Sequence, residues 1–327
     1  MIERQNVESI DILRGLASIS VAFYHVSCGN INFMSDNLFK SIVSWGWLGV
    51  EVFFVISGFI IPYSLWKSNF ILSEHWYKFI SKRVIRIDPP YFISIILTIG
   101  LWYLSSLSPG FKGISPDINF GQIAAHIGYV VDFIGSSWIQ PVYWTLAIEF
   151  QYYLLIMLVV GFLISNNWTR RFVLLLLIFS PFLVSGKYIV FHWFALFSLG
   201  ISAFLFSAQK INFPEFLLFT LLGLIICAFE MGIPETIAGL ISVIFILKIK
   251  KKFIEPFHFL GKISYSLYLI HIPIGGRIIN ICVRFADDFY LQLLGIFCAL
   301  SCSLIFGWLF YEYVEKPSKQ LSSRLTY

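Results

Sequence analysis

The chain has 327 residues, of which 58% are hydrophobic and 13% are charged, and its mean hydropathy is +0.81. Soluble domains carry about twice that share of charged residues, so the composition excludes a water-soluble globular protein. The net charge is +5, but the basic residues lie between apolar runs rather than on one face, which argues against nucleic-acid binding. The five cysteines form no C-x-x-C pair, so we expect no disulfide framework and no metal site. The sequence predicts an all-α integral membrane protein.

Ten segments are candidates for transmembrane helices, which need about 20 mostly apolar residues. They are 9–27, 43–65, 87–107, 141–164, 172–186, 189–208, 214–231, 233–249, 259–282 and 290–313. The stretch 121–135 is apolar but too short to span, and it is predicted to be re-entrant or interfacial. Because no repeat, low-complexity tract or linker interrupts the pattern, residues 1–327 are predicted to form a single transmembrane domain.

The distribution of lysine and arginine predicts the orientation of this bundle. With the N-terminus inside, 16 of the 23 basic residues fall in cytoplasmic segments and four fall on the opposite side. Cytoplasmic segments of membrane proteins are enriched in basic residues. We therefore expect both termini to be cytoplasmic, as ten spans require.

The first segment carries two ionisable residues eleven positions apart. Arg14 and His25 lie on one face of a helix, about 16 Å apart along its axis. Arg14 is thus expected near the cytoplasmic edge, with His25 beyond the midplane, and Asp11 can pair with Arg14. Ionisable groups inside a membrane are costly and mark functional sites. For either Arg14 or His25 alone, an anchoring arginine or a packed core histidine is the alternative.

The second segment contains Glu51 near its outer end and Ser57 near its middle. Glu51 is either functional or the partner of a basic residue. Ser57 and Gly58 predict a small-residue packing contact between helices, and the Ser57 hydroxyl is also a candidate donor to an oxyanion.

A basic cluster precedes the third segment in the sequence KRVIRIDPPY. Lys82, Arg83 and Arg86 are expected at the inner mouth of the bundle, beside a helix break at Pro89 and Pro90. Arg83 and Arg86 are three residues apart and face the same way on a helix. Such a pair suits bidentate binding of a phosphate, whereas a positive-inside anchor is the alternative.

The fourth segment places Glu149 at a depth comparable to that of His25. A buried carboxylate needs a partner, and His25 is a candidate because a carboxylate would fix the imidazole tautomer, as in acyl transfer catalysed by histidine. A structural ion pair with Arg277 is the alternative. We therefore consider His25, Glu149 and Asp11 as candidate catalytic residues.

The last two segments add further candidates. Tyr268 is a possible donor to an oxyanion, and His271 is a second base, a hydrogen-bond donor or a packed interior histidine, with the last two preferred. Pro273 is expected to bend the helix after His271. Glu312 and Glu315 are expected to form salt bridges at the cytoplasmic end.

Five motifs occur in order between residue 9 and about residue 317. They are R-x10-H from Arg14 to His25, EVFFVISGF from Glu51, RVIRIDPPY from Arg83, WTLAIE from Trp144 and SYSLYLIHIP from Ser264. In this order they resemble the acyltransferase-3 family, whose members are bacterial membrane O-acyltransferases that modify cell-surface and exported glycans.

The resemblance implies an O-acyltransferase, foremost an O-acetyltransferase, of the bacterial inner membrane. It implies acetyl-CoA or another acyl-CoA as the cytoplasmic donor. The acceptor is a hydroxyl of an extracytoplasmic glycan or glycolipid, such as O-antigen, exopolysaccharide or lipo-oligosaccharide. His25 becomes the catalytic base, and Glu149 orients it or stabilises charge. Arg14, Arg83 and Arg86, with Lys82 beside them in the basic cluster, bind the CoA.

The sequence is compatible with a second class of function and with two routes of acyl transfer. A secondary transporter or flippase of a lipid-linked glycan has a similar composition, but it should contain an internal repeat, and we find none. Some family members carry a second, extracytoplasmic domain; this chain ends at Tyr327, so we expect it to act alone or with a separate partner. The acyl group passes directly to the acceptor or first rests on a tyrosine or serine of the protein.

Overall fold

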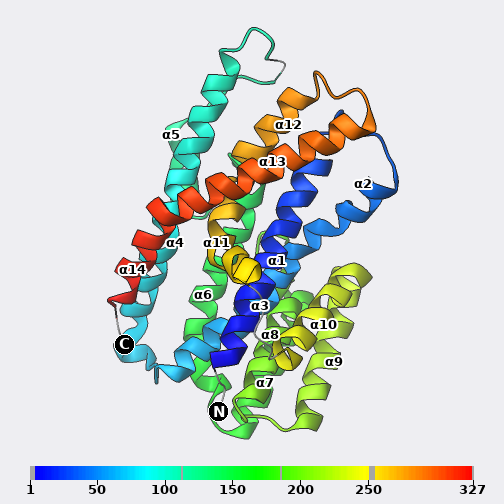
Figure 1. The fold of residues 1–327 in the computed structure, drawn as a ribbon. Coiled ribbons are helices and arrows are strands. Elements are labelled where there is room, and N and C mark those ends of the chain that lie inside the picture. The colour runs from blue at the N-terminus through cyan, green and yellow to red at the C-terminus, as the bar shows by residue number, and fades with distance from the viewer. Residues whose placement is uncertain (1–3, 112, 185, 250–254, 326–327) are drawn as a thin grey trace.

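The computed structural model describes residues 4–111, 113–184, 186–249 and 255–325, and every regular element in these ranges is helical (Figure 1). The α-helices are α1 (Arg4–Cys28), α2 (Leu38–Val43), α3 (Gly49–Lys67), α4 (Leu72–Ser106), α5 (Phe120–Ile127), α6 (Trp144–Leu163), α7 (Asn167–Leu183), α8 (Phe194–Ser207), α9 (Phe213–Glu230), α10 (Ile233–Lys248), α11 (Glu255–His271), α12 (Arg277–Cys282), α13 (Phe289–Phe310) and α14 (Lys316–Ser323). Short 3-10 helices precede three of them at η1 (Ser44–Leu48), η2 (Pro141–Tyr143) and η3 (Val190–Trp193), and π-helical turns lie at η4 (Ile272–Gly276) and η5 (Tyr311–Glu315).

The ten predicted segments each coincide with a helix or with consecutive helices of this structure. By length and composition, six helical stretches in the described ranges can cross a membrane, namely 38–67, 72–106, 141–163, 190–207, 213–230 and 289–323. Helices α7, α10 and α11 are shorter, with 17, 16 and 17 residues. The apolar stretch 121–135 holds only the eight-residue α5, which is too short to span.

The predicted break at Pro89 and Pro90 is wrong, because α4 runs through both prolines as one 35-residue helix. Each proline removes a backbone donor from the helix. The carbonyl oxygens that lose their donor are those of Ile85 and Arg86, four residues before the prolines. Packing of α4 against neighbouring helices lets a membrane helix continue through such positions. One such contact is the hydrogen bond that the Tyr265 hydroxyl of α11 donates to the carbonyl oxygen of Ile87 at 2.9 Å. The basic cluster is therefore on a continuous helix rather than in a loop.

The bend predicted at Pro273 is a π-helical turn. This turn, η4, begins directly after His271 and separates α11 from α12. A π-helical turn accommodates a residue that cannot donate to the regular helical ladder, and such turns are frequent at functional sites. The other π-helical turn, η5, lets the last helix continue to Ser323, ten residues beyond the predicted end.

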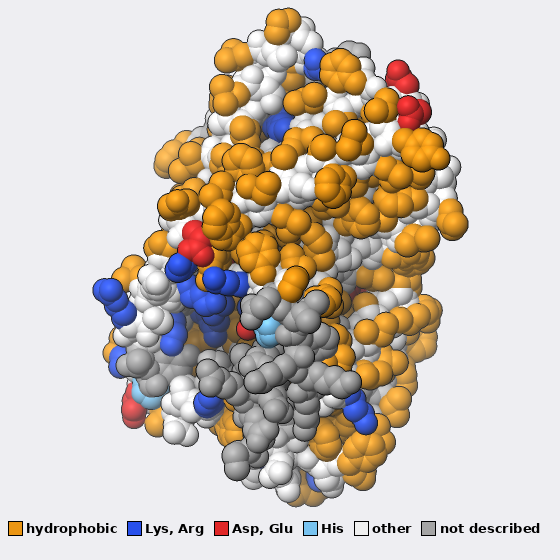
Figure 2. Space-filling view, viewed as in Figure 1, with side chains coloured by type: hydrophobic (Ala, Val, Ile, Leu, Met, Phe, Trp, Pro, Cys, Tyr) orange, Lys and Arg blue, Asp and Glu red, His pale blue; other side chains and the backbone are white. Residues whose placement is uncertain are grey.

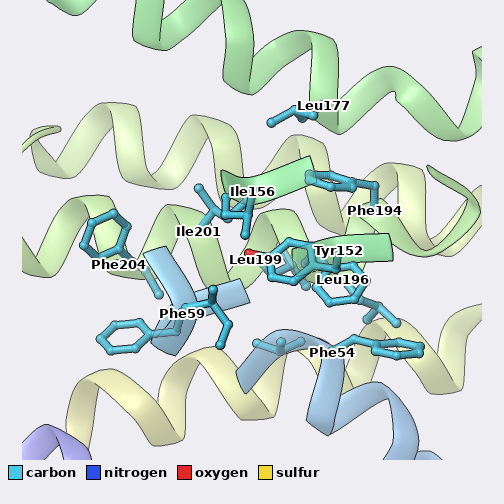
Figure 3. Packing of buried hydrophobic residues seen from close by; sticks show 14 of the residues in the cluster. Phe54, Phe59, Tyr152, Ile156, Leu177, Phe194, Leu196, Leu199, Ile201 and Phe204 are labelled. Atoms are coloured by element: carbon cyan, nitrogen blue, oxygen red, sulfur yellow. The ribbon is translucent and has the colours of Figure 1, made fainter. Parts of the chain in front are cut away.

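The largest apolar core lies between α3, α6 and α8. Tyr152 stacks on Phe197, with ring centroids 4.1 Å apart, and Phe54 packs against the same ring at 4.9 Å. Figure 3 shows Phe54, Tyr152 and Phe194 converging in this layer. The core fixes the position of α3 and α6, which carry Ser57 and Glu149.

Two glycines bring the backbones of α3 and α8 into contact. A Cβ atom on Gly58 would lie 2.2 Å from the carbonyl oxygen of Phe197, and one on Gly200 would lie 2.1 Å from that of Val55. No side chain fits at these distances. The small-residue contact predicted beside Ser57 is thus confirmed.

We expect Gly200→Ala to lower the free energy of unfolding by about 1–3 kcal/mol, because the added methyl group overpacks the contact between α3 and α8. Gly161→Ala is the matched control, since Gly161 is also helical and its Cβ would have no neighbour within 4 Å. The midpoint of thermal unfolding in detergent measures both variants. Equal midpoints for the two variants would contradict the close contact.

The surface is apolar over most of the face shown in Figure 2, where hydrophobic side chains dominate. Large aliphatic and aromatic residues are exposed on several helices, such as Ile96 at 69% and Phe297 at 68%. Lysine and arginine gather at the lower left of the same view, over α4 and α14 (Figures 1 and 2). Both labelled ends of the chain lie in this lower half (Figure 1). An apolar belt with a basic end is typical of a membrane protein.

Candidate active site

A cavity of about 580 Å³ lies among α1, α3, α4, α6 and α11 and the C-terminal turns. Along α3 its lining extends from Val50 to Ser68, which is almost the whole length of that helix. The charged residues that line it are Asp11, Arg14, Lys67, Arg83, Arg86, Glu149, Glu315 and Lys319. The fold therefore brings together ionisable groups from distant parts of the sequence around one cavity.

Three arginines of the cavity lack carboxylate partners. Within the described ranges, no carboxylate lies within ion-pairing distance of Arg14, Arg83 or Arg86. Arg83 is only 8% exposed, and its Nε atom has no hydrogen-bond partner. Its guanidinium carbon lies 5.2 Å from the ring centroids of both Phe79 and Tyr153. Guanidinium groups that form no ion pair with a carboxylate are suited to binding an anion such as phosphate.

The structure contradicts the sequence prediction for two residues near these arginines, Asp11 and Lys82. Asp11 lines the cavity, but the described part of the chain shows no ion pair between it and Arg14, so the predicted pair is wrong. Lys82 is not among the residues that line the cavity, although it is one helical turn from Arg86 on α4. Lys319 does line the cavity. Sequence spacing could not indicate Lys319, since α14 reaches the site only by packing against α4.

His25 has a histidine partner instead of the predicted carboxylate. The His25 Nδ1 atom lies 3.2 Å from Nε2 of His271 and 2.9 Å from the carbonyl oxygen of Val21. The Nδ1 atom of His271 lies 3.1 Å from the carbonyl oxygen of Leu267. His271 is fully buried. Of the roles predicted for His271, the structure therefore favours a packed interior histidine.

These contacts assign the hydrogens of the two imidazoles. A carbonyl oxygen only accepts, so the Nδ1 atom of each ring carries a hydrogen when the ring is neutral. The Nε2 atom of His271 is then an acceptor for the Nδ1–H group of His25. His25 is left with a basic Nε2 atom, as a general base requires.

We expect His271→Leu to lower kcat by about 10-fold with little change in KM, because the Nδ1–H group of His25 loses a buried acceptor. His271→Gln retains an acceptor oxygen and should keep most of the activity. Steady-state kinetics of both variants checks this prediction. Equal losses in the two variants would show that His271 acts only by filling space.

Tyr268 lines the cavity and also contacts one histidine of the pair. Tyr268 lines the cavity, whereas His25 and His271 do not. The Tyr268 ring centroid lies 5.9 Å from that of His271 and 5.7 Å from that of Phe53. Of the two residues that the sequence places on one face of α1, Arg14 lines the cavity and His25 does not.

Glu149 is bound to two hydroxyl groups that line the same cavity. Its Oε1 atom accepts hydrogen bonds from Ser57 Oγ at 2.9 Å and from the Tyr153 hydroxyl at 2.6 Å. The predicted pairing with His25 is wrong, and the described residues show no ion pair between Glu149 and Arg277. Tyr153 was missed by the sequence analysis, although its spacing of four residues from Glu149 places both on one helical face.

Glu51 is buried but lies away from the cavity. It is 3% exposed, and its Oε2 atom has no hydrogen-bond partner in the described part of the chain. It is not among the residues that line the cavity. The described residues also include no basic group in an ion pair with it, so the predicted ion pair is not present.

The two glutamates of the last segment have different surroundings. Glu312 forms ion pairs with Lys262 at 3.7 Å and with Lys316, which confirms the predicted salt bridge. Glu315 instead accepts hydrogen bonds from the backbone N–H and the hydroxyl of Ser266, and it lines the cavity. The salt bridge predicted for Glu315 is wrong, because this side chain points inward toward α11.

Comparison with known proteins identifies the family. A family model described as an acyltransferase domain matches residues 7–312. The chain belongs to the acyltransferase-3 family. No solved structure gives a significant match.

Named relatives extend this assignment. The chain is 25% identical over 313 residues to the “Putative acetyltransferase ORF330” of Acidianus two-tailed virus, covering 86% of this chain and 88% of that protein. It is 30% identical over 197 residues to the “O-acetyltransferase OatA” of Staphylococcus aureus, covering 56% of this chain. The matched region is only 29% of the length of OatA. Together with the apolar helices, the family shows a multi-pass membrane-bound O-acyltransferase.

Proposed function

We propose that this acyltransferase-3 protein transfers an acetyl or related acyl group from cytoplasmic acyl-CoA to a hydroxyl of an exported glycan or glycolipid. In this proposal about ten helices span the inner membrane of a bacterial cell, and both termini are cytoplasmic. The basic end of the molecule, which holds both termini in Figure 1, supports this orientation.

The observation that carries the proposal is the set of three arginines without carboxylate partners in one cavity. Acyl-CoA combines several phosphate charges with a long, thin thioester arm. Arg14, Arg83 and Arg86 offer the planar donors that bind phosphate. The cavity continues from them along α3 into the apolar part of the bundle, where it can hold the uncharged arm.

His25 is the proposed base for the acceptor. Acyl transfer to a sugar requires that the attacking hydroxyl lose its proton, and neutral histidine suits this task. The Nε2 atom of His25 is free to accept that proton because its Nδ1–H group is held by Val21 and His271. His25 lies eleven residues along α1 from Arg14, on the outer side of the cavity.

The test uses bacterial membranes with and without the protein, labelled acetyl-CoA and the lipid-linked glycans of the host. The proposal predicts label in the glycan as an alkali-labile ester only when the protein is present. The acceptor and the acyl donor are varied in turn. Absence of label with all of them, together with export of an unmodified lipid-linked glycan, would favour a transporter instead.

A further inference from the structure

The cavity contains a hydroxyl group that is hydrogen-bonded to a base. Ser57 Oγ donates to Glu149 Oε1 at 2.9 Å, and the Tyr153 hydroxyl donates to the same oxygen at 2.6 Å. All three residues line the cavity that the arginines line. Arg83 lies over the Tyr153 ring, so this group directly adjoins the cationic end of the cavity.

This arrangement has the form of an activated nucleophile. Covalent catalysis uses a hydroxyl within hydrogen-bond reach of a base, and the base is itself oriented by a third group. Ser57 is the hydroxyl, Glu149 is the base and Tyr153 is the orienting group. The α3–α8 contact at Gly58 and the core around Tyr152 hold the two helices that carry them.

Other hydroxyl groups of the cavity do not have this geometry. Those of Ser68, Thr145 and Ser264 donate to backbone carbonyl oxygens, which cannot take a proton. Among the described hydroxyls that line the cavity, only Ser57 and Tyr153 donate to a carboxylate. The Tyr153 ring is fixed beneath Arg83. Ser57 is therefore the better-placed nucleophile.

The position of Glu149 supports a separate loading step. Glu149 and Ser57 line the cavity together with the three arginines, whereas His25 does not. For a thioester bound in this cavity, Glu149 is therefore the base that is already hydrogen-bonded to a hydroxyl of the lining.

We propose that Ser57 carries the acyl group as a covalent ester, with Glu149 as the base that loads it. This inference rests on the proposed function, since it assumes an acyl-CoA donor in the cavity. It divides the transfer between two bases, Glu149 for loading from CoA and His25 for transfer to the acceptor.

The loading step balances as follows. Glu149 takes the proton of the Ser57 hydroxyl while Oγ attacks the thioester carbonyl. The C–S bond breaks, and Glu149 returns the proton to the leaving thiolate, which gives free CoA and an ester on Ser57. In the second step His25 takes the proton of the acceptor hydroxyl, whose oxygen attacks the ester carbonyl. The bond to Ser57 Oγ breaks, and that oxygen regains the proton that His25 took from the acceptor, so both bases return to their starting state.

Two ring contacts connect the neighbourhood of Ser57 with the histidine pair, which supplies the base of the second step. Phe53 lies four residues before Ser57 and hence on the same face of α3. Its ring contacts Tyr268, whose ring in turn contacts His271. An ester on Ser57 is therefore one side-chain layer from the histidine pair.

The experiment incubates purified protein in nanodiscs with [1-14C]acetyl-CoA without acceptor, quenches it in acid and maps the labelled peptide. Wild-type protein should carry label on Ser57. Ser198→Ala is the matched control, because Ser198 is a buried helical serine that does not line the cavity, and it should be labelled like wild type. In Glu149→Gln the side chain keeps an acceptor oxygen but cannot take a proton. Ser57 of this variant should therefore be acylated about 10²- to 10⁴-fold more slowly.

Two substitutions of Ser57 distinguish loss of the nucleophile from loss of the folded protein. Ser57→Ala should lose the label. Ser57→Cys should form a thioester that neutral hydroxylamine cleaves, whereas the serine ester resists it. Label retained in Ser57→Ala, or mapped to another residue, would overturn the proposal.

Glycan acylation by the same preparation separates this inference from the proposed function. Acylated glycan without any protein-bound label on rapid quenching would overturn the serine ester and leave the proposed function intact. Neither acylated glycan nor labelled protein would overturn both.

Discussion

His25→Ala is expected to lower acyl transfer to the acceptor by about 10²- to 10⁴-fold, the usual contribution of a general base. The imidazole is held at Nδ1 by Val21 and His271, so alanine removes the basic Nε2 atom that this contact orients. Labelled glycan formed per minute, at equal protein in the membrane, measures the loss. Loading of the protein by acetyl-CoA should continue, because that step uses a different base.

A matched histidine variant distinguishes catalysis from structure. His192 lies in η3, away from the cavity and from the histidine pair. His192→Ala should retain activity, and both variants should elute as single species in detergent. Near-normal transfer by His25→Ala would remove this residue from the reaction.

Arg86→Ala is expected to raise the KM for acetyl-CoA by about 10- to 100-fold. A hydrogen bond to a charged group contributes about 1.5–3 kcal/mol, and about 1.4 kcal/mol corresponds to a tenfold change in affinity. Arg86→Lys should recover part of the loss, because lysine keeps the charge but not the planar fork. KM is measured at saturating acceptor.

The donor itself supplies the sharpest control. Acetyl-pantetheine has the thioester arm without the phosphates of CoA, so its KM should be the same for wild type and Arg86→Ala. Arg284→Ala should bind acetyl-CoA normally, because Arg284 donates to the carbonyl oxygen of Gly110 outside the cavity. An equal rise in KM for both donors would assign Arg86 to structure rather than to phosphate binding.

The helices and the basic cluster could be predicted because they depend on short-range patterns. Apolar runs of membrane-spanning length correspond to helices here. Arg83 and Arg86 face one cavity because a separation of three residues keeps them on one helical face. The break at Pro89 was predicted wrongly, because a local rule ignores the packing of α4 against other helices, which lets it continue through both prolines.

The pairings inside the site depend on the tertiary arrangement. His25 and His271 were both candidates, but their contact joins helices 246 residues apart in the chain. Glu149 was assigned to His25 on depth alone, whereas the rotation of α6 about its axis directs it toward Ser57. Depth can be estimated from position along a span. Which face of one helix contacts which face of another cannot be derived from a single sequence.

The Tyr268 hydroxyl joins two helices beside the cavity. It lies 2.7 Å from the Thr145 hydroxyl and 3.1 Å from the carbonyl oxygen of Val142, so α11 is tied to the start of α6 at the outer end of the cavity. The described residues show no continuous cavity from the arginines past the Tyr268 ring to the histidines. A molecule that passes from the cavity to the histidine pair along this route must therefore displace the Tyr268 side chain, which costs the contacts of its hydroxyl with Thr145 and Val142.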